Sequence, residues 1–183
     1  MSTRPHVVVI GGGFGGLAAV RALAGKDVRV TLFDRHNHHL FQPLLYQVAT
    51  AGLSATDISA PLRHILRDQS NATVMMEWVS EIDLAQRHIR LADGRRVDFD
   101  HLVIATGATH AYFGNDAWAV NAPGLKTLGD ALDVRRRFLT AYERAEATTD
   151  ADERDALMTF AVVGAGRPAW NWRARWPKSR GTP

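Results

Sequence analysis

The stretch His6-Val-Val-Val-Ile-Gly-Gly-Gly-Phe-Gly-Gly16 decides the fold of this 183-residue chain. Residues 7–10 are β-branched and apolar, which predicts a buried strand, and residues 17–23 have the apolar spacing of a helix. Between them, residues 11–16 have the spacing Gly-x-Gly-x-x-Gly and form what we call the first glycine turn. This order predicts a nucleotide-binding α/β unit, with a glycine-rich turn of an ordinary α/β protein as the alternative.

Each glycine of this motif has a separate physical role. Gly11 permits the tight bend, Gly13 lets the backbone approach a diphosphate, and Gly16 lets the helix pack closely on the strand. The helix start adds free N–H groups and a positive dipole end, which favour phosphate. A second predicted strand, residues 28–33, ends at Asp34, whose carboxylate can accept hydrogen bonds from a ribose hydroxyl. An acid there disfavours a 2′-phosphate, so NADP is not expected.

Length and cysteine content limit the classes of protein. The chain is long enough for one good core and the beginning of a second, but not for two complete nucleotide-binding domains. It has no cysteine, which excludes a disulfide framework, a thiolate metal site and a redox-active thiol pair. Its N-terminus has no apolar segment of spanning or signal-peptide length, so we expect a cytoplasmic location.

The positive charge of the chain is concentrated at its C-terminal end. The net charge is +3, and residues 167–183 contain five basic side chains and no acid, which leaves the rest of the chain at −2. The body of the protein therefore has no excess of basic residues that would follow a phosphate backbone. We expect no nucleic-acid partner.

A polar and then an apolar run follow Asp34. The first is Arg35-His-Asn-His-His39 and the second is Leu40-Phe-Gln-Pro-Leu-Leu-Tyr-Gln-Val-Ala-Thr50. His36, His38 and His39 lack carboxylates or cysteines at ligand spacing, so a solvated loop is expected rather than a metal site. Ser59 and Pro61 are predicted to open a short amphipathic helix over residues 62–67, whose aliphatic side chains enter the core.

The periodicity then changes from helix to strand. We predict a β-meander from residues 73–76, 78–83, 88–91 and 96–99, with a hairpin turn at Asp93-Gly94. The meander leads into residues 101–107, an apolar strand that ends in Ala105-Thr106-Gly107. Such an end can lie against a ligand at the carboxyl edge of a parallel sheet, although a plain strand-to-loop transition is an equal alternative.

The last third of the chain begins with a long helical pattern over residues 128–147. Its apolar positions Leu132, Phe138, Leu139 and Tyr142 are predicted to enter a core. Residues 150–155 are charged and predicted to form a loop. Residues 159–163 are predicted to form another buried strand that leads into Gly164-Ala-Gly166, the start of a second glycine turn.

With two glycine turns, a β-meander and an Ala-Thr-Gly strand between them, the chain resembles the two-dinucleotide-binding flavoproteins. Three segments give a narrower resemblance, to the N-terminal part of type II NADH:quinone oxidoreductases. They are Val8-Val-Ile-Gly-Gly-Gly-Phe-Gly-Gly-Leu17, Leu40 to Thr50 and Leu102-Val-Ile-Ala-Thr-Gly107. The resemblance covers residues 5–166. Its middle segment is the specific part, because many families share the glycine motifs.

The resemblance implies a fold and a set of domains. The fold is α/β, a Rossmann-like FAD-binding domain with a parallel sheet and a β-meander, followed by the start of a second dinucleotide-binding unit. The expected divisions are an incomplete FAD-binding domain at 1–112, a connecting segment with a helix at 113–158, the start of an NADH-binding domain at 159–166, and a tail at 167–183.

The resemblance also implies FAD on the first glycine turn. Gly11, Gly13 and Gly16 are expected at the diphosphate and Asp34 at the adenosine ribose. Val79 is expected near the adenine, and Pro43 and Leu44 near the isoalloxazine. The remaining residues of the implied FAD site are Phe14, Gly15, Arg35, Ala105, Thr106 and Gly107, with the last two beside the phosphates.

In the same family NADH would bind the second glycine turn, here represented by Gly164 and Gly166, and pass hydride to the flavin. Quinone would then collect electrons at the membrane surface, where the full-length relative is expected to bind peripherally on the inner face. We therefore predict the FAD-binding part of an NADH:quinone oxidoreductase, inactive as a separate piece.

The residues after Gly166 depart from the family pattern. Prolines, tryptophans and arginines without a period do not form the helix that a second glycine turn requires. Tryptophan has one codon, TGG, and asparagine has two, AAC and AAT. In a reading frame shifted by one base, each new codon consists of the last base of one codon and the first two bases of the next. Read in this way, Trp170-Asn171-Trp172 must encode glutamate followed by leucine. The same shift at Trp176-Pro177 must encode alanine.

Across the tail this shifted frame permits Gly-x-Gly-Pro-Thr-Gly-Val-Glu-Leu-Ala-Gly-Ala-Leu-Ala-Glu, a complete glycine turn and helix start. Our hypothesis is that one base was gained or lost near codon 166 and that residues 167–183 are translated out of frame. In that case the tail's charge and tryptophans have no function. Genomic DNA sequence across this codon tests the hypothesis, and codons incompatible with the shifted peptide would remove it.

Other classes fit less well. Thiol-disulfide flavoreductases and sulfide:quinone enzymes require reactive cysteines. A short-chain dehydrogenase requires Tyr-x-x-x-Lys, whereas Tyr142 is followed at that spacing by Glu146. A flavin monooxygenase is compatible with the first glycine turn but not with residues 40–50. A non-catalytic FAD- or nucleotide-binding remnant is the remaining alternative.

Overall fold

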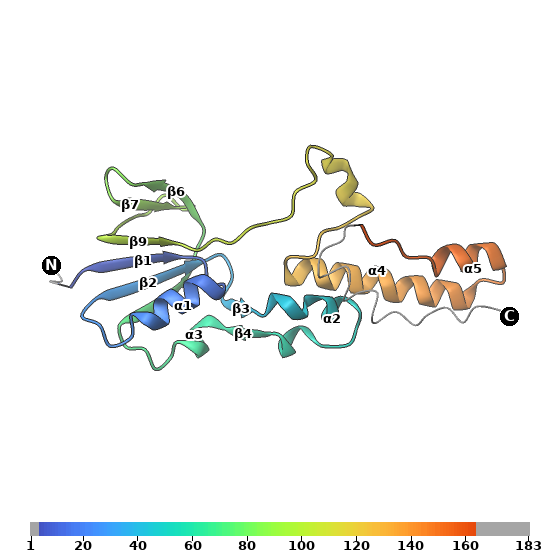
Figure 1. Ribbon diagram of the computed structural model, residues 1–183, viewed down its shortest axis with the longest axis horizontal. Coiled ribbons are helices and arrows are strands. Elements are labelled where there is room, and N and C mark those ends of the chain that lie inside the picture. Colours follow the sequence, from blue (N-terminus) through green and yellow to red (C-terminus); the bar gives the residue numbers. More distant parts are fainter. Residues whose placement is uncertain (1–3, 164–183) are drawn as a thin grey trace. The chain divides into compact units, whose positions relative to one another are not determined.

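A computed structural model describes residues 4–163 of the chain, which form two compact units (Figure 1). The first unit contains residues 4–40 and 59–108, and the second contains residues 41–58 and 109–163. The chain therefore leaves the first unit after residue 40 and returns to it at residue 59.

The first unit is built on a four-stranded parallel sheet. Its strands lie in the order β5 (Ala72–Met76), β2 (Arg29–Asp34), β1 (His6–Ile10) and β9 (His101–Ile104). All three pairings are parallel. Strand β1 is buried along its whole length, as expected for an apolar strand with a neighbour on each side.

Alternating side chains of the sheet enter two separate cores. Val7 and Val9 of β1 pack with α1 (Phe14–Ala22) and α3 (Leu62–Ile65), where Leu62 is fully buried. Val8 and Ile10 enter the opposite core, because successive side chains of a strand point to opposite faces. That core is shared with a three-stranded antiparallel meander of β6 (Val79–Asp83), β7 (His88–Leu91) and β8 (Arg96–Asp98).

The structure corrects two predictions about strands in this unit. Residues 73–76 do form a strand, but β5 pairs with β2 in the parallel sheet and not with the meander. The segment 36–39 is not wholly a solvated loop, because β3 (His38–Leu40) pairs with β4 (Ser59–Pro61). His36 is exposed, whereas His38 and His39 are half-buried. Ser59 and Pro61 are the ends of strand β4, whereas the helix begins at Leu62 as predicted, with Pro61 as its N-cap, and ends at Ile65.

His6 is a buried histidine of β1 that the sequence analysis did not single out. Its Nδ1 lies 2.7 Å from the carbonyl oxygen of Asp98, and its Nε2 lies 2.8 Å from Oγ1 of Thr31. This arrangement fits a neutral ring that donates from Nδ1 to the carbonyl and accepts the Thr31 hydroxyl proton at Nε2. Burial is the main cause that lowers the pKa of His6 below its ordinary value of 6.5.

We therefore expect the stability of the chain to fall as the pH falls through 6.5. Below this value the unfolded chain protonates His6, while the folded chain holds it neutral, so the unfolded state binds more protons. The stabilising contribution is complete above pH 6.5 and is lost toward the lowered folded-state pKa. Urea unfolding between pH 7.5 and 5 measures this contribution of His6 to the free energy of unfolding. A His6→Asn variant that loses as much stability over this range as the parent would contradict this assignment.

The second unit is helical within the described residues. It contains α2 (Leu45–Ala49), which packs on α4 (Leu128–Ala147), and α5 (Ala151–Leu157). Helix α4 has the predicted bounds and starts with a capping box of Thr127 and Asp130. Three short 3₁₀ turns complete the unit: η1 (Gln42–Leu44), η2 (Ala55–Asp57) and η3 (Asp116–Val120). Among residues 4–163, no helix combines the length and apolar character that a membrane span requires.

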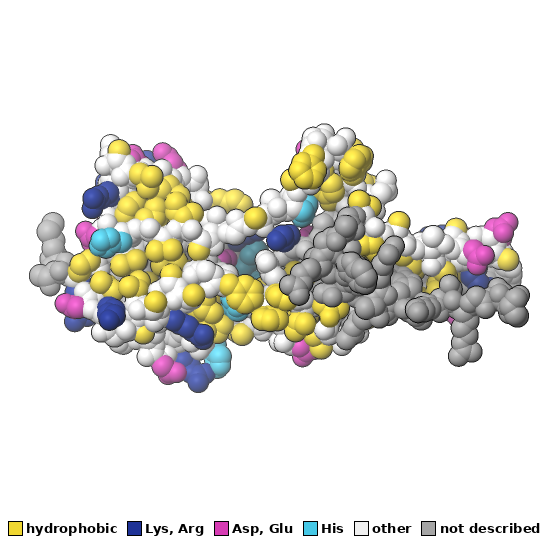
Figure 2. All heavy atoms as spheres, viewed as in Figure 1, with side chains coloured by type: hydrophobic (Ala, Val, Ile, Leu, Met, Phe, Trp, Pro, Cys, Tyr) yellow, Lys and Arg dark blue, Asp and Glu magenta, His cyan; other side chains and the backbone are white. Residues whose placement is uncertain are grey.

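Two predictions about the apolar and charged residues of this unit are wrong. Leu132 and Leu139 of α4 are 45% and 42% exposed and do not lie in a core. Figure 2 shows hydrophobic side chains on the surface of both units. Residues 151–155 are helical rather than a loop, because the Asp150 side chain accepts hydrogen bonds from the backbone of Asp152 and Glu153 and caps α5.

The strand predicted at residues 159–163 is also absent from the described structure. Within residues 4–163 this segment joins no sheet, and Val163 is 80% exposed. A parallel strand is stable only when it pairs with neighbours, and no described strand pairs with this one. Its first aromatic residue, Phe160, instead lies 5.3 Å from Phe138, measured between ring centroids. Gly164 and Gly166, which follow it, lie outside the described residues.

Candidate nucleotide-binding site

The first glycine turn lies between β1 and α1. Gly11 has a φ of +102°, a conformation that favours glycine, and its N–H donates to the Phe33 carbonyl at 2.8 Å. Gly13 is the N-cap of α1 and accepts a hydrogen bond from the backbone of Leu17. Within the described residues, α1 has neither a side-chain cap nor an acid in its first turn. Its first N–H groups, which have no acceptor within the helix, therefore suit an anion.

The space around the three glycines separates their roles. A Cβ on Gly11 would lie 2.3 Å from the Ala105 carbonyl oxygen, and a Cβ on Gly16 would lie 1.7 Å from the Gly11 carbonyl oxygen. Both distances are impossible contacts, so the fold itself requires glycine at these positions. Gly13 has no atom within 4 Å of the same point. Its missing side chain leaves open space beside the helix start, as a bound diphosphate requires.

Asp34 lies beside the first glycine turn at Gly12. One of its carboxylate oxygens accepts from the backbone N–H of Gly12 at 2.5 Å, and the other accepts from His36 at 2.7 Å. The side chain is 18% exposed, so its oxygens remain partly accessible to a ligand. Its bond to Gly12 fixes the carboxylate beside the turn. The sequence analysis assigned Asp34 a role at a ribose but did not foresee this structural hydrogen bond.

His39 contacts the first glycine turn through its ring. Its Nδ1 lies 3.0 Å from the Gly12 carbonyl oxygen, and its ring meets the ring of Phe14 edge-on with centroids 4.9 Å apart. The Phe14 side chain is 49% exposed. Burial lowers the pKa of the adjacent His38, and the nearby His36 lowers it further. The apolar run that begins at Leu40, directly after these histidines, was the sequence signal that they would be packed.

The end of β9 lies directly against the turn. Ala105 donates its backbone N–H to the Ile10 carbonyl at 2.8 Å, and a Cβ on Gly15 would lie 3.8 Å from that of Ala105. The Cα of Thr106 would lie 3.2 Å from a Cβ on Gly11. Gly107 adopts a φ of +71°, and no atom lies within 4 Å of the point where its Cβ would be. The predicted residues of the glycine turn, Asp34 and the Ala-Thr-Gly segment thus meet at one carboxyl edge of the sheet.

The other predicted site residues have different positions. Arg35 is exposed, and its guanidinium carbon lies 5.6 Å from the centroid of the Trp78 ring. Val79, the first residue of β6, is half-buried and packs against the core under the meander. Pro43 and Leu44 belong to η1 of the second unit.

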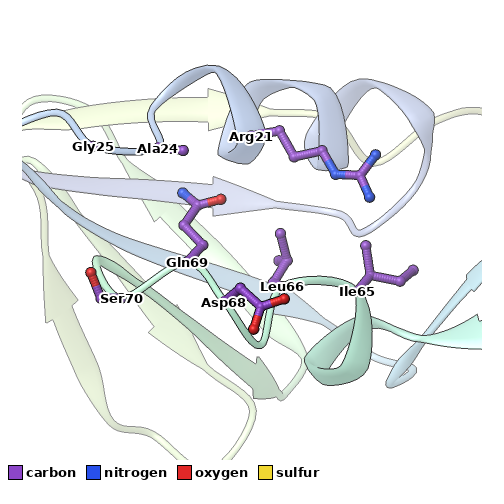
Figure 3. A pocket seen from close by; sticks show the side chains of 8 residues that line it. All are labelled: Arg21, Ala24, Gly25, Ile65, Leu66, Asp68, Gln69 and Ser70. Carbon is purple, nitrogen blue, oxygen red and sulfur yellow. The ribbon is translucent and has the colours of Figure 1, made fainter.

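A separate pocket lies at the other end of α1 (Figure 3). It has a volume of about 430 Å³ and is open to solvent. Its lining residues are Arg21, Ala24, Gly25, Ile65, Leu66, Asp68, Gln69 and Ser70. The glycine turn precedes α1, whereas this pocket lies at the C-terminal end of that helix, so the pocket does not coincide with the candidate nucleotide site.

Comparison with known proteins agrees with this geometry. Residues 5–169 match the model of the pyridine nucleotide-disulphide oxidoreductases. The chain belongs to this family. Members of the pyridine nucleotide-disulphide oxidoreductase family share the parallel sheet and antiparallel strands described above. The match ends at residue 169, so it stops shortly after the second glycine turn.

Individual relatives show which proteins of this kind the chain is similar to. The type II NADH:quinone oxidoreductase NdhA of Mycobacterium tuberculosis is 51% identical over 166 residues, which are 89% of this chain and 35% of that protein. The sulfide:quinone oxidoreductase structure from Aquifex aeolicus has a TM-score of 0.69 and 31% identity, and covers 76% of this chain and 32% of that one. The chain thus spans about a third of the length of these relatives.

A third member shows the shared fold alone. The structure of NDH2 from Plasmodium falciparum in complex with NADH has a TM-score of 0.73 at 23% identity. It covers 82% of this chain and 32% of that one. The resemblance of the sequence to type II NADH:quinone oxidoreductases is confirmed by the sequence comparison, and the structure comparison agrees with the fold.

Proposed function

We propose that the first unit binds FAD on the first glycine turn and that the chain is the FAD-binding part of an NADH:quinone oxidoreductase. The observation that supports this most is the open space at Gly13, at the start of α1, together with the carboxylate of Asp34 that is held at the neighbouring Gly12. The similarity to the M. tuberculosis enzyme supports the choice of flavin and of reaction class.

In this proposal each part of the site contacts a different part of the cofactor. Backbone amides at Gly13 and Gly15 and the Thr106-Gly107 segment hold the diphosphate, and Asp34 holds the adenosine ribose. The family resemblance assigns Pro43 and Leu44 to the isoalloxazine. NADH binds at Gly164 and Gly166, which lie outside the described residues. Bound FAD supplies hydride acceptance from NADH and electron delivery to a quinone at the membrane surface.

The charges of the described site favour a dinucleotide without a 2′-phosphate, such as FAD, over NADP. The dipole of α1 stabilises the negative diphosphate, and no acid in the first turn of that helix opposes it. The Asp34 carboxylate repels a 2′-phosphate, which selects FAD, ADP or NAD over NADP at this turn. The chain has no cysteine, so its own side chains supply no thiol redox step.

We expect purified chain to bind FAD but to turn over no NADH. The first glycine turn is complete, whereas residues 159–163 of the second unit join no sheet and Val163 is exposed. The test is to mix the 183-residue polypeptide with FAD, remove free cofactor, record the flavin spectrum and add NADH with a soluble quinone. Absence of bound flavin would remove the FAD assignment. Turnover of NADH would show that the second turn is functional.

A non-catalytic nucleotide-binding remnant is the second candidate, and the exposed segment at residues 159–163 favours it. The two candidates differ in one measurement. The 183-residue chain is expected to behave as the remnant does, with a flavin spectrum that NADH leaves unchanged, whereas bleaching by NADH would show that it retains the hydride-transfer step of the enzyme. Another flavin-dependent class, such as a monooxygenase, would show bleaching without electron transfer to quinone.

A further inference from the structure

The turn between β7 and β8 contains the only Asp-Gly pair of the sequence, Asp93-Gly94, and the sequence has no Asn-Gly pair. Both residues are exposed. Gly94 has a φ of +88°, and no atom lies within 4 Å of the point where its Cβ would be. Because glycine has no side chain, nothing on residue 94 itself shields its backbone nitrogen from the carboxyl group of Asp93.

An aspartyl–glycine pair of this kind rearranges without an enzyme when its carboxyl group is protonated. The Gly94 nitrogen forms a bond to Cγ of Asp93, and the carboxyl hydroxyl leaves with the amide proton as water. A second water then opens the succinimide ring. Cleavage of the new bond to Cγ restores aspartate, whereas cleavage of the original peptide bond gives isoaspartate, whose backbone runs through Cβ and Cγ. One water leaves and one enters, so nothing is oxidised or reduced.

The structure holds both reacting groups in unreactive states. The backbone N–H of Arg95 donates to one carboxylate oxygen of Asp93 at 3.0 Å, and its Nε donates to the other. These two bonds, the backbone bond first, lower the pKa of Asp93 below its ordinary value of 3.8. An ionised carboxylate has no hydroxyl to lose. The Gly94 N–H in turn donates to the Leu91 carbonyl at 2.9 Å.

We propose that Asp93 is a site of spontaneous isomerisation to isoaspartate and that Arg95 limits its rate. The exposed turn supplies the reacting pair, and the ion pair with Arg95 withholds the protonated acid. The guanidinium of Arg95 is also paired with Glu77, which follows β5, so its position depends on the folded meander. Asp93 is therefore expected to react faster in the unfolded chain.

Isomerisation at this turn would affect the core of the first unit. Isoaspartate adds one backbone carbon to a short hairpin whose turn is closed by a hydrogen bond from the Leu91 N–H to the Arg95 carbonyl. Leu91 is 1% exposed and lies in the same core as Val8 and Ile10 of β1. We therefore expect the isomerised chain to unfold at a lower urea concentration than the unmodified chain.

The test follows residue 93 while the full chain is incubated at neutral pH in water enriched in oxygen-18. Each opening of the succinimide adds one heavy oxygen, so peptide mass reports the reaction even where aspartate is restored, and fragmentation locates isoaspartate. Arg95→Ala is expected to raise the rate severalfold. The matched control is Arg96→Ala, because Arg96 is similarly exposed, 49% against 52%, but is paired with Asp98. Its rate should equal the parent's.

Two further measurements separate protection by Arg95 from general loosening of the hairpin. Glu77→Gln removes the carboxylate that fixes Arg95 but keeps Arg95 beside Asp93, so its rate should stay at the parent's. In concentrated urea, the parent and Arg95→Ala should react at one common rate, which is faster than that of the folded parent.

Equal rates in the folded parent and folded Arg95→Ala would overturn the role of Arg95. Increases as large in Arg96→Ala or Glu77→Gln would overturn it too, as would an effect of Arg95→Ala that persists in urea. Absence of both heavy oxygen and isoaspartate at residue 93 in urea would overturn the site itself.

Discussion

Replacing Gly16 with alanine is expected to unfold the first unit, whereas replacing Gly13 with valine is expected to leave it folded and unable to bind nucleotide. The Cβ of an alanine at position 16 would lie 1.7 Å from the Gly11 carbonyl oxygen, a backbone atom that moves only if β1 and α1 separate. We expect a loss of about 3 kcal/mol or more in the free energy of unfolding.

A Cβ at position 13 would meet no atom within 4 Å, and the extended backbone of Gly13 suits any residue. We expect Gly13→Val to cost about 1 kcal/mol as a change of N-cap residue. The valine fills the space of the diphosphate and removes its hydrogen bonds to the helix start, so ADP affinity should fall more than about 100-fold.

Urea unfolding and ADP titration of both variants distinguish these effects. Gly94→Ala is a suitable control, because Gly94 has a φ of +88° in open space at the turn between β7 and β8. It should cost about 1 kcal/mol for its left-handed backbone and leave ADP affinity unchanged. A Gly16→Ala variant as stable as the Gly94→Ala variant would contradict the packing described here.

Replacing Asp34 with alanine is expected to affect stability and nucleotide binding together. The carboxylate accepts from the amides of Gly12 and His36, and losing these charge-assisted bonds should lower the free energy of unfolding by about 2 kcal/mol. The ribose also loses its acceptor, so ADP affinity should fall more than about tenfold while pyrophosphate affinity changes much less.

Asp34→Asn separates the two roles. It keeps the size of the side chain and one acceptor oxygen but removes the negative charge, so ligands with a 2′-phosphate should bind better than they do to the parent. The control is Asp83→Ala, which removes an exposed carboxylate that accepts from the backbone of Gln86 in the meander. A titration with adenosine 2′,5′-bisphosphate measures the change. Unaltered discrimination against the 2′-phosphate in Asp34→Asn would show that Asp34 does not face the ribose.

Local signals predicted the centre of this fold well. The strand β1, the first glycine turn and α1 follow one another without a gap, so their geometry depends on neighbours in sequence. Asp34 was predicted at the turn because a glycine motif and an acid at the end of the next strand form a single supersecondary unit. The bounds of α4 were predicted because its capping box and periodicity are both local.

Features that depend on distant partners were missed. Residues 38–40 form a strand only because residues 59–61 pair with them, and β5 joins the parallel sheet only because β2 offers it an edge. The contact between Arg35 and Trp78 joins residues far apart in sequence, so no spacing rule indicates it. In the second unit, the Asp150 cap outweighed the charged composition of residues 151–157 and produced a helix.

A crystal structure of the chain soaked with ADP tests the assignment of the first glycine turn most directly. The diphosphate is predicted to lie within hydrogen-bonding distance of the amides at the start of α1, beside Gly13, with the ribose hydroxyls on Asp34. ADP bound elsewhere, for instance in the pocket beside Arg21, with the space at Gly13 left empty, would contradict the assignment.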